Sequence, residues 1–554
     1  MSATSVAEPD LEPAAADDDL RDSIPTPSDT PSKTPDPPLP PVAERLAPPM
    51  PRGGWRGWAG PLGVTALAAA LRLPGLGTPN ALVFDETYYV KDGLSLIRFG
   101  FERQSVDNAN ALILASNGDA SALAIFKPDA GFVVHPPVGK WVIGLGEKFF
   151  GVTPFGWRIG VAVLGILSVL MVARIARRLT RSNLLGVTAG LFMAIDGLAI
   201  VHSRTALLDQ TIAFWIIAAF GALLLDRDRT RQRLATKIAD VDPAVYRSGG
   251  FGPGMGVRPW RIVAGVCLGL ACGTKWNGVF YVVAFVFLSL LWDWGARRMI
   301  GVRMPLLATV ARDAIPAIAS LAVLAALVYT ATWAGWFLTS GGYDRNWGAG
   351  QSGMIPFVPD ALRAWWHYQS DMYTSSASIT SPHAYRANPW GWPILARPTS
   401  FFYESPTLGQ KGCTAPQCAQ EVIALGNPVI WWAGALALVH QAWRWIAVRD
   451  WRSGAVVVGF LAGWAPWLHY QERTVFSFYT IIFLPFTIMA LTMSLGTLLG
   501  RADASPNRRM YGAMLAGAVV LGAIAASYFF FPIWTGQVIP QSQWQLRMWF
   551  PTWV

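Results

Sequence analysis

The sequence predicts an all-α integral membrane protein with about eleven transmembrane helices. Only 14% of its 554 residues are charged, whereas about a quarter is usual in soluble globular proteins. Apolar runs close to the roughly 20 residues that span a bilayer recur along the chain. The chain also holds 27 tryptophans, and tryptophan is enriched where membrane proteins meet the lipid headgroups.

Residues 1–56 are predicted to be a disordered cytoplasmic tail. They are rich in Pro, Ala and Asp and have almost no large apolar side chains, so they cannot bury enough surface to fold. They also lack the basic start and the apolar stretch of a signal peptide. We therefore interpret the first apolar run as an uncleaved anchor.

The apolar runs define the predicted organisation. They lie at about residues 58–73, 155–173, 184–201, 206–225, 260–274, 277–294, 311–338, 428–446, 454–470, 475–499 and 510–534. The first seven form a membrane module over residues 57–338, which includes a long polar loop at 76–154. A second polar loop, 339–427, separates this module from a four-span region at 428–554.

Clusters of basic residues predict the orientation. Loops with several Arg or Lys alternate with short loops that carry one cation each, and the rich loops face the cytoplasm under the positive-inside rule. The rich loops are 174–181, 227–258, 297–303, 449–452 and 501–509. The C-terminus and both long loops then lie outside the cell membrane. These loops also account for the net charge of +10, so nucleic acid is not an expected partner.

The second long loop carries a predicted helix and a predicted disulfide. Residues 360–373 indicate an amphipathic helix on the membrane surface, because apolar and aromatic side chains recur there at helical spacing. Cys413 and Cys418 lie in polar sequence of the same loop. Outside the cytoplasm we favour a disulfide between them over two free thiols.

Two adjacent carboxylates, Asp85 and Glu86, follow the first span within an aromatic segment. Partial desolvation near a membrane raises the pKa of a carboxyl group, which suits a general base. The alternative is a helix N-cap with an acidic first turn. Arg72, at the outer end of the first span, is expected to pair with one of the two carboxylates.

Further candidates lie in the outer loops. His135 and Lys140 flank a rigid Pro-Pro turn, where they would hold a headgroup or a loop; a solvated lysine at a helix start is the alternative. Asp209 lies inside the fourth span, which marks it as a functional candidate with an expected partner. Arg204 is the natural partner, and a purely structural Arg–Asp pair is the alternative.

Four cations are predicted at one outer depth: Arg158, Arg204, Lys275 and Arg473. Single cations on the side that the positive-inside rule leaves sparse require an explanation. A shared lipid phosphate would supply it, because Arg and Lys bind phosphate well. Snorkelling of individual side chains to the interface is the alternative.

Together these residues resemble the protein O-mannosyltransferase family, specifically its actinobacterial-type members. The matching motifs are Phe84-Asp85-Glu86-Thr87-Tyr88-Tyr89, His135-Pro136-Pro137-Val138-Gly139-Lys140, Trp157-Arg158-Ile159, Asp196-Gly197, Ser203-Arg204 with Leu207-Leu208-Asp209, Thr274-Lys275-Trp276 and Asn388-Pro389-Trp390-Gly391-Trp392-Pro393. The resemblance implies a GT-C membrane fold, a polyprenyl phosphate mannose donor and a Ser/Thr acceptor. It covers about residue 57 to the end.

The resemblance implies transfer by direct displacement with inversion at the anomeric carbon. Asp85 would take the proton of the acceptor hydroxyl while Glu86 orients the acceptor or tunes Asp85. The four cations would stabilise the leaving phosphate electrostatically. The sequence shows no metal-ligand cluster, and a divalent cation (Mg²⁺ or Mn²⁺) held by Asp85 or Glu86 stays an open alternative. The expected acceptor is an unfolded or translocating exported protein, with a place near the Sec translocon as one alternative.

Two other functions are weighed against this one. A related GT-C enzyme would add a sugar to cell-envelope glycan or lipid instead of protein. A transporter or lipid flippase would carry polar residues near the bilayer midplane and broken helices in matched halves. The ionisable residues gather instead at one predicted face, in contact with membrane lipid headgroups, which favours the transferase.

Overall fold

The computed structural model describes residues 41–50, 54–119, 124–239, 241, 245–246, 249–351, 357–501 and 503–554. Most of the predicted tail lies outside the described residues. Its last part corrects the prediction, because α1 (Val42–Leu46) is a short helix within 1–56. Leu46 is buried against Leu234 of α9 and Ile300, so one large apolar side chain suffices to order this turn on the neighbouring helices.

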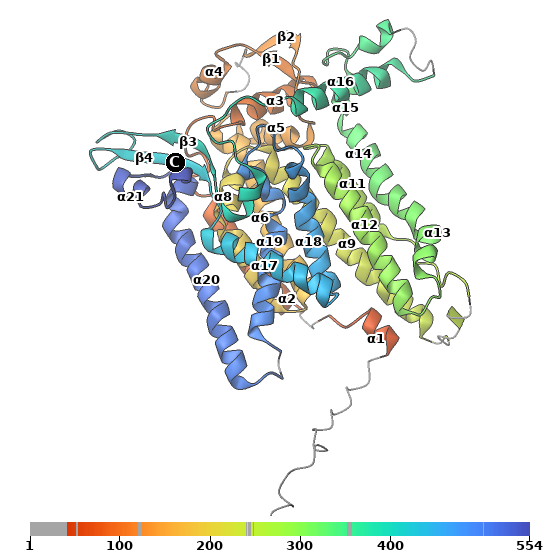
Figure 1. The fold of residues 1–554 in the computed structure, drawn as a ribbon. Coiled ribbons are helices and arrows are strands. Elements are labelled where there is room, and N and C mark those ends of the chain that lie inside the picture. Colours follow the sequence, from red (N-terminus) through yellow and green to blue (C-terminus); the bar gives the residue numbers. More distant parts are fainter. Residues whose placement is uncertain are drawn as a thin grey trace, which may run out of the picture. The chain divides into compact units, whose positions relative to one another are not determined.

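Each predicted apolar run contains a helix. These helices are α2 (Arg56–Arg72), α6 (Pro154–Thr180), α7 (Asn183–Ile195) with α8 (Gly197–Arg204), α9 (Leu208–Ile238), α11 (Pro259–Cys272), α12 (Gly278–Met299), α13 (Pro305–Ile318) continued through a π-helical turn (Ala319–Val323) into α14 (Leu324–Thr332), α17 (Pro428–Ala447), α18 (Trp451–Trp464), α19 (Leu484–Leu499) and α20 (Pro506–Thr535). Figure 1 shows the long helices running side by side.

Local sequence sets where several of these helices begin. Thr153 caps α6 by accepting a hydrogen bond from Gly156 N, with Pro154 in the first turn, and Asn427 caps α17 in the same way. Asp196 interrupts the third predicted span, because its carboxylate caps α8 through Ala199 N at 3.1 Å. The apolar run at 184–201 predicts a single span, whereas the structure divides it into two helices bent by 57° relative to each other.

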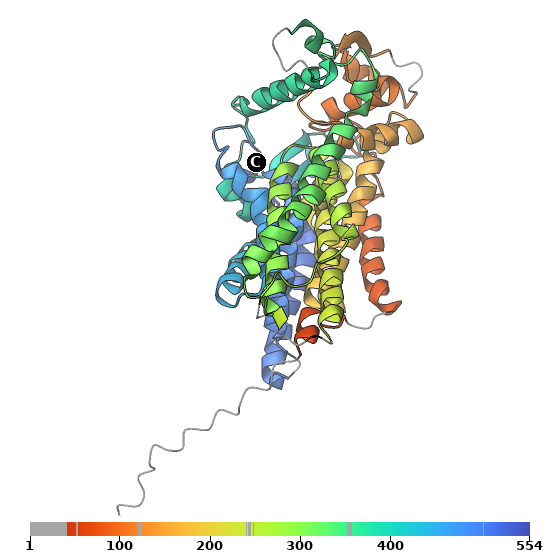
Figure 2. The same cartoon turned by 90° about the vertical axis from the view of Figure 1, so that its right-hand side faces the viewer.

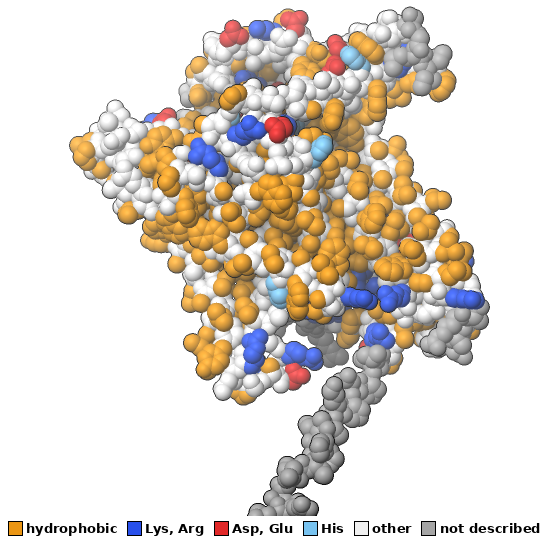
Figure 3. Space-filling model, in the orientation of Figure 1, with side chains coloured by type: hydrophobic (Ala, Val, Ile, Leu, Met, Phe, Trp, Pro, Cys, Tyr) orange, Lys and Arg blue, Asp and Glu red, His pale blue; other side chains and the backbone are white. Residues whose placement is uncertain are grey.

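Length and composition mark fewer spans than the predicted eleven. Within the described residues, five helices are long and apolar enough to cross a membrane, and the bent pair α7–α8 makes a sixth. Figure 3 shows hydrophobic side chains over the middle of one face, with most charged side chains above and below them. The protein is therefore a mostly helical, multi-span membrane protein.

The two long polar loops fold together at one end of the long helices, at the top of Figures 1 and 2. The first forms α3 (Glu86–Phe99), β1 (Arg103–Ser105), α4 (Ala109–Ala115), β2 (Phe126–Ala130) and α5 (Val138–Phe150). The second, beginning just after α15 (Ala334–Leu338), forms α16 (Asp360–Ala377), β3 (Thr399–Glu404) and β4 (Cys418–Ala424). The C-terminal residues add β5 (Val538–Pro540) and α21 (Gln541–Gln545).

Two small antiparallel sheets correct the prediction of an all-α fold. One pairs β1 with β2, and the other has the order β3-β4-β5. Cys418 of β4 is paired with Pro540 of β5, so the chain end is joined to the second long loop. Cys413 and Cys418 form the disulfide that the sequence predicted.

The amphipathic helix of the second loop is confirmed as α16, which extends to Ala377. Its buried side is formed by Ala364, Tyr368, Gln369 and Met372, which pack with Trp333 and Trp336. The predicted apolar face is only partly buried, since Trp366 is 68% exposed. Figure 2 shows α16 running across one end of the long helices.

Short 3₁₀ turns complete the described structure. They lie at Trp347–Gly350, Pro389–Ile394, Ala465–Leu468, Ser477–Ile482 and Pro551–Trp553. Proline is within the first two positions of three of them, at Pro389–Ile394, Ala465–Leu468 and Pro551–Trp553, where its fixed φ suits a helical start. The turn at Ser477–Ile482 matters most for the site, since it brings Phe478 against Phe84 of the first long loop and Tyr479 against Lys275.

Candidate active site

The segment before α3 presents the acidic pair. Phe84 adopts a positive φ of 51°, which is uncommon for a residue with a side chain and recurs at functional sites. Its ring stacks on Phe401 of β3 at 4.8 Å. Asp85 occupies the N-cap position of α3, yet its carboxylate makes no cap hydrogen bond within the described structure. The N-cap alternative is therefore confirmed in position, with Asp85 at the N-cap and Glu86 in the first turn, but not as a side-chain cap.

Glu86 is fully buried and held by Arg158. The guanidinium donates through Nε to Oε1 and through NH2 to Oε2, both at 2.8 Å. Backbone N–H groups of Val83 and Ala206 also donate to this carboxylate, each at 2.8 Å. Glu86 therefore holds the segment that carries Asp85, and its predicted role of orienting the acceptor or tuning Asp85 stays a prediction.

Arg158 is also committed to structure. Besides Glu86, it donates to the carbonyl oxygens of Leu76, Pro79 and Ala81 at 3.2, 3.0 and 2.9 Å. Every N–H donor of the guanidinium thus has an acceptor. The predicted phosphate-binding role of Arg158 is wrong, because no donor remains for a lipid headgroup. We call this arrangement of Arg158, Glu86 and the 76–81 carbonyls the clamp.

Asp85 takes no part in the clamp's hydrogen bonds within the described structure and is partly exposed. Tyr89, one helical turn further along α3, donates to Oδ2 at 3.4 Å. Desolvation by the surrounding protein raises the pKa of Asp85 to about 6; the nearby Lys275 ammonium opposes this shift and Asp209 adds to it. A carboxyl group with a pKa near neutrality suits proton abstraction.

Lys275 and Asp209 form the second feature of the site. Lys275, in the turn between α11 and α12, donates from Nζ to Asp209 Oδ2 at 2.8 Å. Asp209 lies in the first turn of α9, and its Oδ1 is buried without a hydrogen-bond partner in the described structure. The predicted Arg204–Asp209 pair is therefore wrong, because Lys275 takes the place of Arg204.

Arg204 and Arg72 fasten the helices beneath the site. Arg204 donates to the carbonyl oxygens of Arg72, Pro74 and Gly75 at 2.7, 2.8 and 2.7 Å. Arg72 donates to Ser203 Oγ at 3.0 Å and to two carbonyls at the end of α7. Neither makes a hydrogen bond or ion pair with the acidic pair in the described structure, so the predicted pairing of Arg72 with one of these carboxylates is wrong. Arg204 Nε is buried without a hydrogen-bond partner among the described residues, and the phosphate role of Arg204 stays a prediction.

His135 and Lys140, which the sequence places together, have different surroundings in the structure. Lys140 is buried between Asp92 at 3.2 Å and Glu102 at 2.8 Å, which removes it from the predicted set of headgroup ligands. His135 stays at the site, with its ring 6.1 Å from that of Tyr89. Burial, together with the positive charges of Lys275, Lys140 and Arg473, lowers the pKa of His135 well below its usual value. It is therefore a neutral imidazole near Asp85.

Arg473 faces a large apolar groove. Its Nε donates to Ser376 O at 2.6 Å, and the guanidinium lies 5.9 Å from the ring centre of Trp467. We call the adjoining cavity of about 900 Å³ the lateral groove. Its walls come from α11, α12, the 319–332 segment, α16 and the 467–473 turn, and they include Val279, Phe280, Val283, Ala322, Ala326, Tyr329, Trp365, Trp366, Tyr373, Trp467 and Arg473.

Two family models match this chain. "Dolichyl-phosphate-mannose-protein mannosyltransferase" matches residues 63–237, and "C-terminal four TMM region of protein-O-mannosyltransferase" matches residues 361–553. A polyprenol-phosphate-mannose–protein mannosyltransferase of Mycobacterium tuberculosis is 36% identical over 509 residues, which is 90% of this chain and 92% of the relative. This chain belongs to the protein O-mannosyltransferase family.

Other similarities agree with this assignment. The corresponding mannosyltransferase of Corynebacterium glutamicum is 32% identical over 88% of this chain and 92% of that relative. Among solved structures, the Saccharomyces cerevisiae protein O-mannosyltransferase Pmt1–Pmt2 complex bound to the sugar donor matches with a TM-score of 0.66 and 15% identity, covering 93% of this chain and 94% of that chain. At this identity the match shows the fold alone.

In this mannosyltransferase, α16 is tied down over the lateral groove. Trp276 Nε1 donates to the Tyr329 hydroxyl at 2.8 Å, and that hydroxyl donates to Gln369 Oε1 of α16. Trp276 directly follows Lys275 in sequence. These hydrogen bonds thus tie α16 to the residue that follows Lys275 in the chain.

Some site residues were missed from the sequence. Tyr89 had a usable signal, because it lies four residues after Asp85 in a helix and therefore on the same face. Tyr479, whose ring centre is 5.2 Å from Lys275 Nζ, and Phe401 had none, because they reach the site only through tertiary packing. Asp92 and Glu102 were likewise not recognised as the partners of Lys140.

The described residues contain one group of three side chains that could hold a metal ion, formed by Asp344, His367 and Asp371. It lies on α16 and the turn before it, and it does not include the acidic pair. Glu86 already accepts hydrogen bonds on both oxygens. The sequence suggests Asp85 or Glu86 as a metal ligand, and of these two only Asp85 still has a carboxylate free to bind a metal within the described structure.

Proposed function

We propose that this enzyme transfers one mannose from polyprenyl phosphate mannose to Ser or Thr hydroxyls of exported proteins, with inversion, at the extracytoplasmic face of the cell membrane. The observation that carries the proposal is the position of Asp85. It is a partly exposed carboxyl group of raised pKa, fixed by the clamp beside it and facing the charge of Lys275. Full-length similarity to mycobacterial and corynebacterial protein mannosyltransferases supports the same activity.

The lateral groove suits the donor lipid. Its lining is mostly apolar and aromatic, as a polyprenyl chain requires, and it is formed by helices that also face the membrane. Arg473 supplies a cation within the same lining. The donor phosphate would lie between Arg473 and Lys275, so the phosphate set proposed here contains two of the four predicted cations.

The proposed reaction is a single displacement. The acceptor oxygen forms a bond to the anomeric carbon of mannose while the bond from that carbon to the phosphate oxygen breaks. The hydroxyl proton passes to Asp85, and the electron pair of the broken bond stays on the polyprenyl phosphate. Lys275 and Arg473 stabilise the extra negative charge, which is the kind of preorganised electrostatics that lowers such barriers most.

Asp209 acts on this reaction through Lys275. Its carboxylate accepts a hydrogen bond from the buried ammonium and fixes its direction, and its second oxygen has no partner in the described structure. His135, as a neutral imidazole, can donate or accept a hydrogen bond at the mannose or the phosphate without adding charge. Both are positioning residues and neither takes the transferred proton.

The orientation in the membrane is also a proposal. The loops rich in Arg and Lys would face the cytoplasm, which places the acidic pair and α16 outside. Single cysteines on a Cys267→Ser/Cys272→Ser background test this at Leu408 and at Arg501, one in each predicted compartment. A membrane-impermeant maleimide should label the first and not the second in intact cells. The reverse pattern would refute the orientation.

A transfer assay tests the function. The purified full-length enzyme in lipid nanodiscs is given labelled polyprenyl phosphate mannose and a Ser/Thr-rich peptide, and mannosyl-peptide is measured. Asp85→Asn should lower transfer by about 100- to 10,000-fold, the usual contribution of a general base. Asp107→Asn is the matched control, because Asp107 is a fully exposed acid of the same outer loop. Transfer only to lipid or glycan acceptors would favour the alternative GT-C activity, and normal transfer by Asp85→Asn would refute the base assignment.

A further inference from the structure

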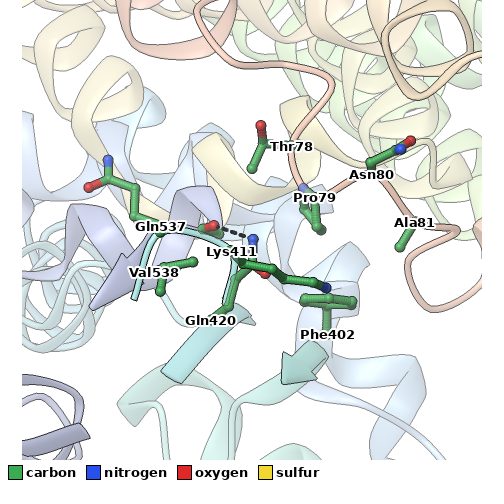
Figure 4. A pocket seen from close by; sticks show the side chains of 11 residues that line it. Thr78, Pro79, Asn80, Ala81, Phe402, Lys411, Gln420, Gln537 and Val538 are labelled. Carbon is green, nitrogen blue, oxygen red and sulfur yellow. Dashed lines mark hydrogen bonds between the residues drawn. The ribbon is translucent and has the colours of Figure 1, made fainter. Parts of the chain in front are cut away.

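A second cavity lies on the outer side of the molecule, against the loop that precedes the acidic pair. It has a volume of about 620 Å³, and we call it the outer pocket. Three segments line it: residues 78–81, the β3–β4 hairpin and residues 536–538. Figure 4 shows side chains from all three facing the same space. Neither the donor nor the base of the proposed reaction uses it.

The outer pocket is joined to the site by the clamp. The carbonyl oxygens of Pro79 and Ala81, in its wall, accept hydrogen bonds from Arg158. Ala81 and Asp85 are four residues apart, so their Cα atoms are at most about 14 Å apart even in extended chain. A Cβ at Gly536 would meet Pro79 Cδ at 3.2 Å, which shows how closely the C-terminal segment packs on this wall.

The lining chemistry differs from that of the lateral groove. Asn80, Gln420 and Gln537 contribute three carboxamides, each able to donate and accept hydrogen bonds. Gln420 is 6% exposed, and its Nε2 donates to Gly536 O at 2.9 Å. Its Oε1 is buried without a partner in the described structure. An unpaired buried acceptor is costly, and an N–H of a ligand in the pocket would relieve that cost.

The neighbouring sheet favours an extended polypeptide over a sugar. β5 is an edge strand in the order β3-β4-β5, and Val538 of β5 lines the pocket. An edge strand offers backbone N–H and C=O groups to an incoming strand. Carboxamide side chains beside it can bond the peptide groups of the same strand without selecting its side chains.

We propose that the outer pocket binds the main chain of the acceptor polypeptide a few residues away from the Ser or Thr that is modified. This inference rests on the proposed function. It predicts that the enzyme recognises extended acceptor chain and not an isolated hydroxyl amino acid. It also predicts little sequence preference at the bound residues, because the contacts are made with backbone groups.

One charged residue adds a preference. Lys411 lines the pocket and pairs with Glu404 across the hairpin. Both side chains are exposed, and exposed pairs are weak enough to exchange partners. Lys411 should therefore favour an acidic acceptor residue that enters the pocket, in exchange for Glu404.

The main test compares a long and a short acceptor. We would measure kcat/KM for a twelve-residue peptide with one Thr and for N-acetyl-threonine amide, which is too short to reach the pocket. In Gln420→Leu and in the double variant Asn80→Ala/Gln537→Ala, the ratio of long to short should fall about 3- to 10-fold per lost hydrogen bond. Thr414→Ala, an exposed change on the same hairpin outside the lining, should keep the wild-type ratio.

The outcomes separate this inference from the proposed function. Absence of transfer by the wild-type enzyme to either acceptor contradicts the proposed function itself. An unchanged ratio in both pocket variants contradicts the inference alone. Competition by a soluble mannose oligosaccharide that is lost in the double variant would identify a glycan site and also overturn it.

Photo-cross-linking tests the outer pocket without variants and without the short acceptor. It therefore remains decisive if the variants fold poorly or the short acceptor reacts too slowly. The wild-type enzyme is irradiated with the long peptide carrying a photoreactive residue four positions from the Thr. Cross-links to residues 78–81, 411–412 or 536–538 are expected, and cross-links confined to other segments would refute the site.

The proposed preference for an acidic acceptor residue is tested with two matched variants of the hairpin ion pair. A peptide with Glu four positions from the Thr should have a lower KM than the same peptide with Gln. Lys411→Ala should abolish this difference, whereas Glu404→Gln, which frees Lys411, should keep or enlarge it. Equal loss in both variants would indicate that only the hairpin ion pair matters.

Discussion

The site contains two cation–carboxylate pairs that are built differently. Arg158 meets Glu86 through two hydrogen bonds and fills its remaining donors with carbonyl oxygens. Lys275 meets Asp209 through one hydrogen bond, and the second oxygen of Asp209 has no partner in the described structure. A saturated pair stabilises the fold, whereas an unsaturated one keeps capacity for a substrate. The same residue types therefore serve structure in one case and, we propose, chemistry in the other.

Breaking the saturated pair should have the largest effect. Arg158→Met leaves the buried Glu86 carboxylate without its partner, and such a loss costs about 3–5 kcal/mol. We expect a lower unfolding temperature and less folded enzyme in detergent, measured by thermal unfolding. The double variant Arg158→Met/Glu86→Gln should recover part of the stability. A folded Arg158→Met enzyme with weakened donor binding would instead return Arg158 to the phosphate site.

Breaking the unsaturated pair should affect the reaction first. Lys275→Met removes a charge from the proposed leaving phosphate, and we expect kcat to fall by about 100- to 1,000-fold, as for loss of one preorganised donor. The double variant Lys275→Met/Asp209→Asn is the control, because it also removes the Asp209 carboxylate that Lys275→Met leaves without a partner. Its kcat should be as low as that of Lys275→Met, and it should be more stable than that single variant. Near-normal kcat in either variant would contradict this role of Lys275.

The raised pKa of Asp85 predicts that kcat/KM depends on pH. The base must be ionised, and its pKa is about 6 because of desolvation. Below that value kcat/KM should fall about tenfold per pH unit, and above it the profile should level off, because kcat/KM reports the free enzyme. The residual activity of Asp85→Asn should lack this step. A wild-type profile that is flat between pH 5 and about 7 would contradict the assignment.

A substitution that loosens α16 tests whether the lateral groove binds the donor lipid, and its expected effect is smaller. Tyr329→Phe removes the hydroxyl that joins Trp276 to Gln369. Loss of these hydrogen bonds should raise the KM for the polyprenyl donor by about 3- to 10-fold, with the KM for the peptide unchanged. Tyr528→Phe is the matched control, because Tyr528 is 86% exposed on α20 and lies outside the groove lining.

Metal removal should have the smallest effect. Because Glu86 is committed to the clamp, we propose that transfer needs no divalent cation. Chelation followed by added Mg²⁺ or Mn²⁺ is expected to change the rate less than about twofold, since a metal that stabilised the phosphate would contribute several kcal/mol. Loss of activity on chelation and recovery with Mn²⁺ would contradict this and would direct attention to Asp85 or to the Asp344 group.

The sequence by itself determined the class of the molecule. Apolar run length, charge deficit and basic loops predicted a multi-span helical membrane protein, and each run contains a helix. The motif residues Asp85, Lys275 and Asp209 were found before the structure, as was the Cys413–Cys418 disulfide. These features depend on local composition and spacing, so they are readable along the chain.

Only the tertiary structure decided which charged groups pair. The sequence suggests Arg204 as the natural partner of Asp209, yet Lys275, from the turn between α11 and α12, takes that place. Sequence spacing does not reveal which guanidinium has all its donors filled by carbonyls, as in Arg158, nor that β5 completes a sheet with β4. A buried ionic group must be satisfied by whatever the packed neighbours offer, and those neighbours are set by the fold as a whole.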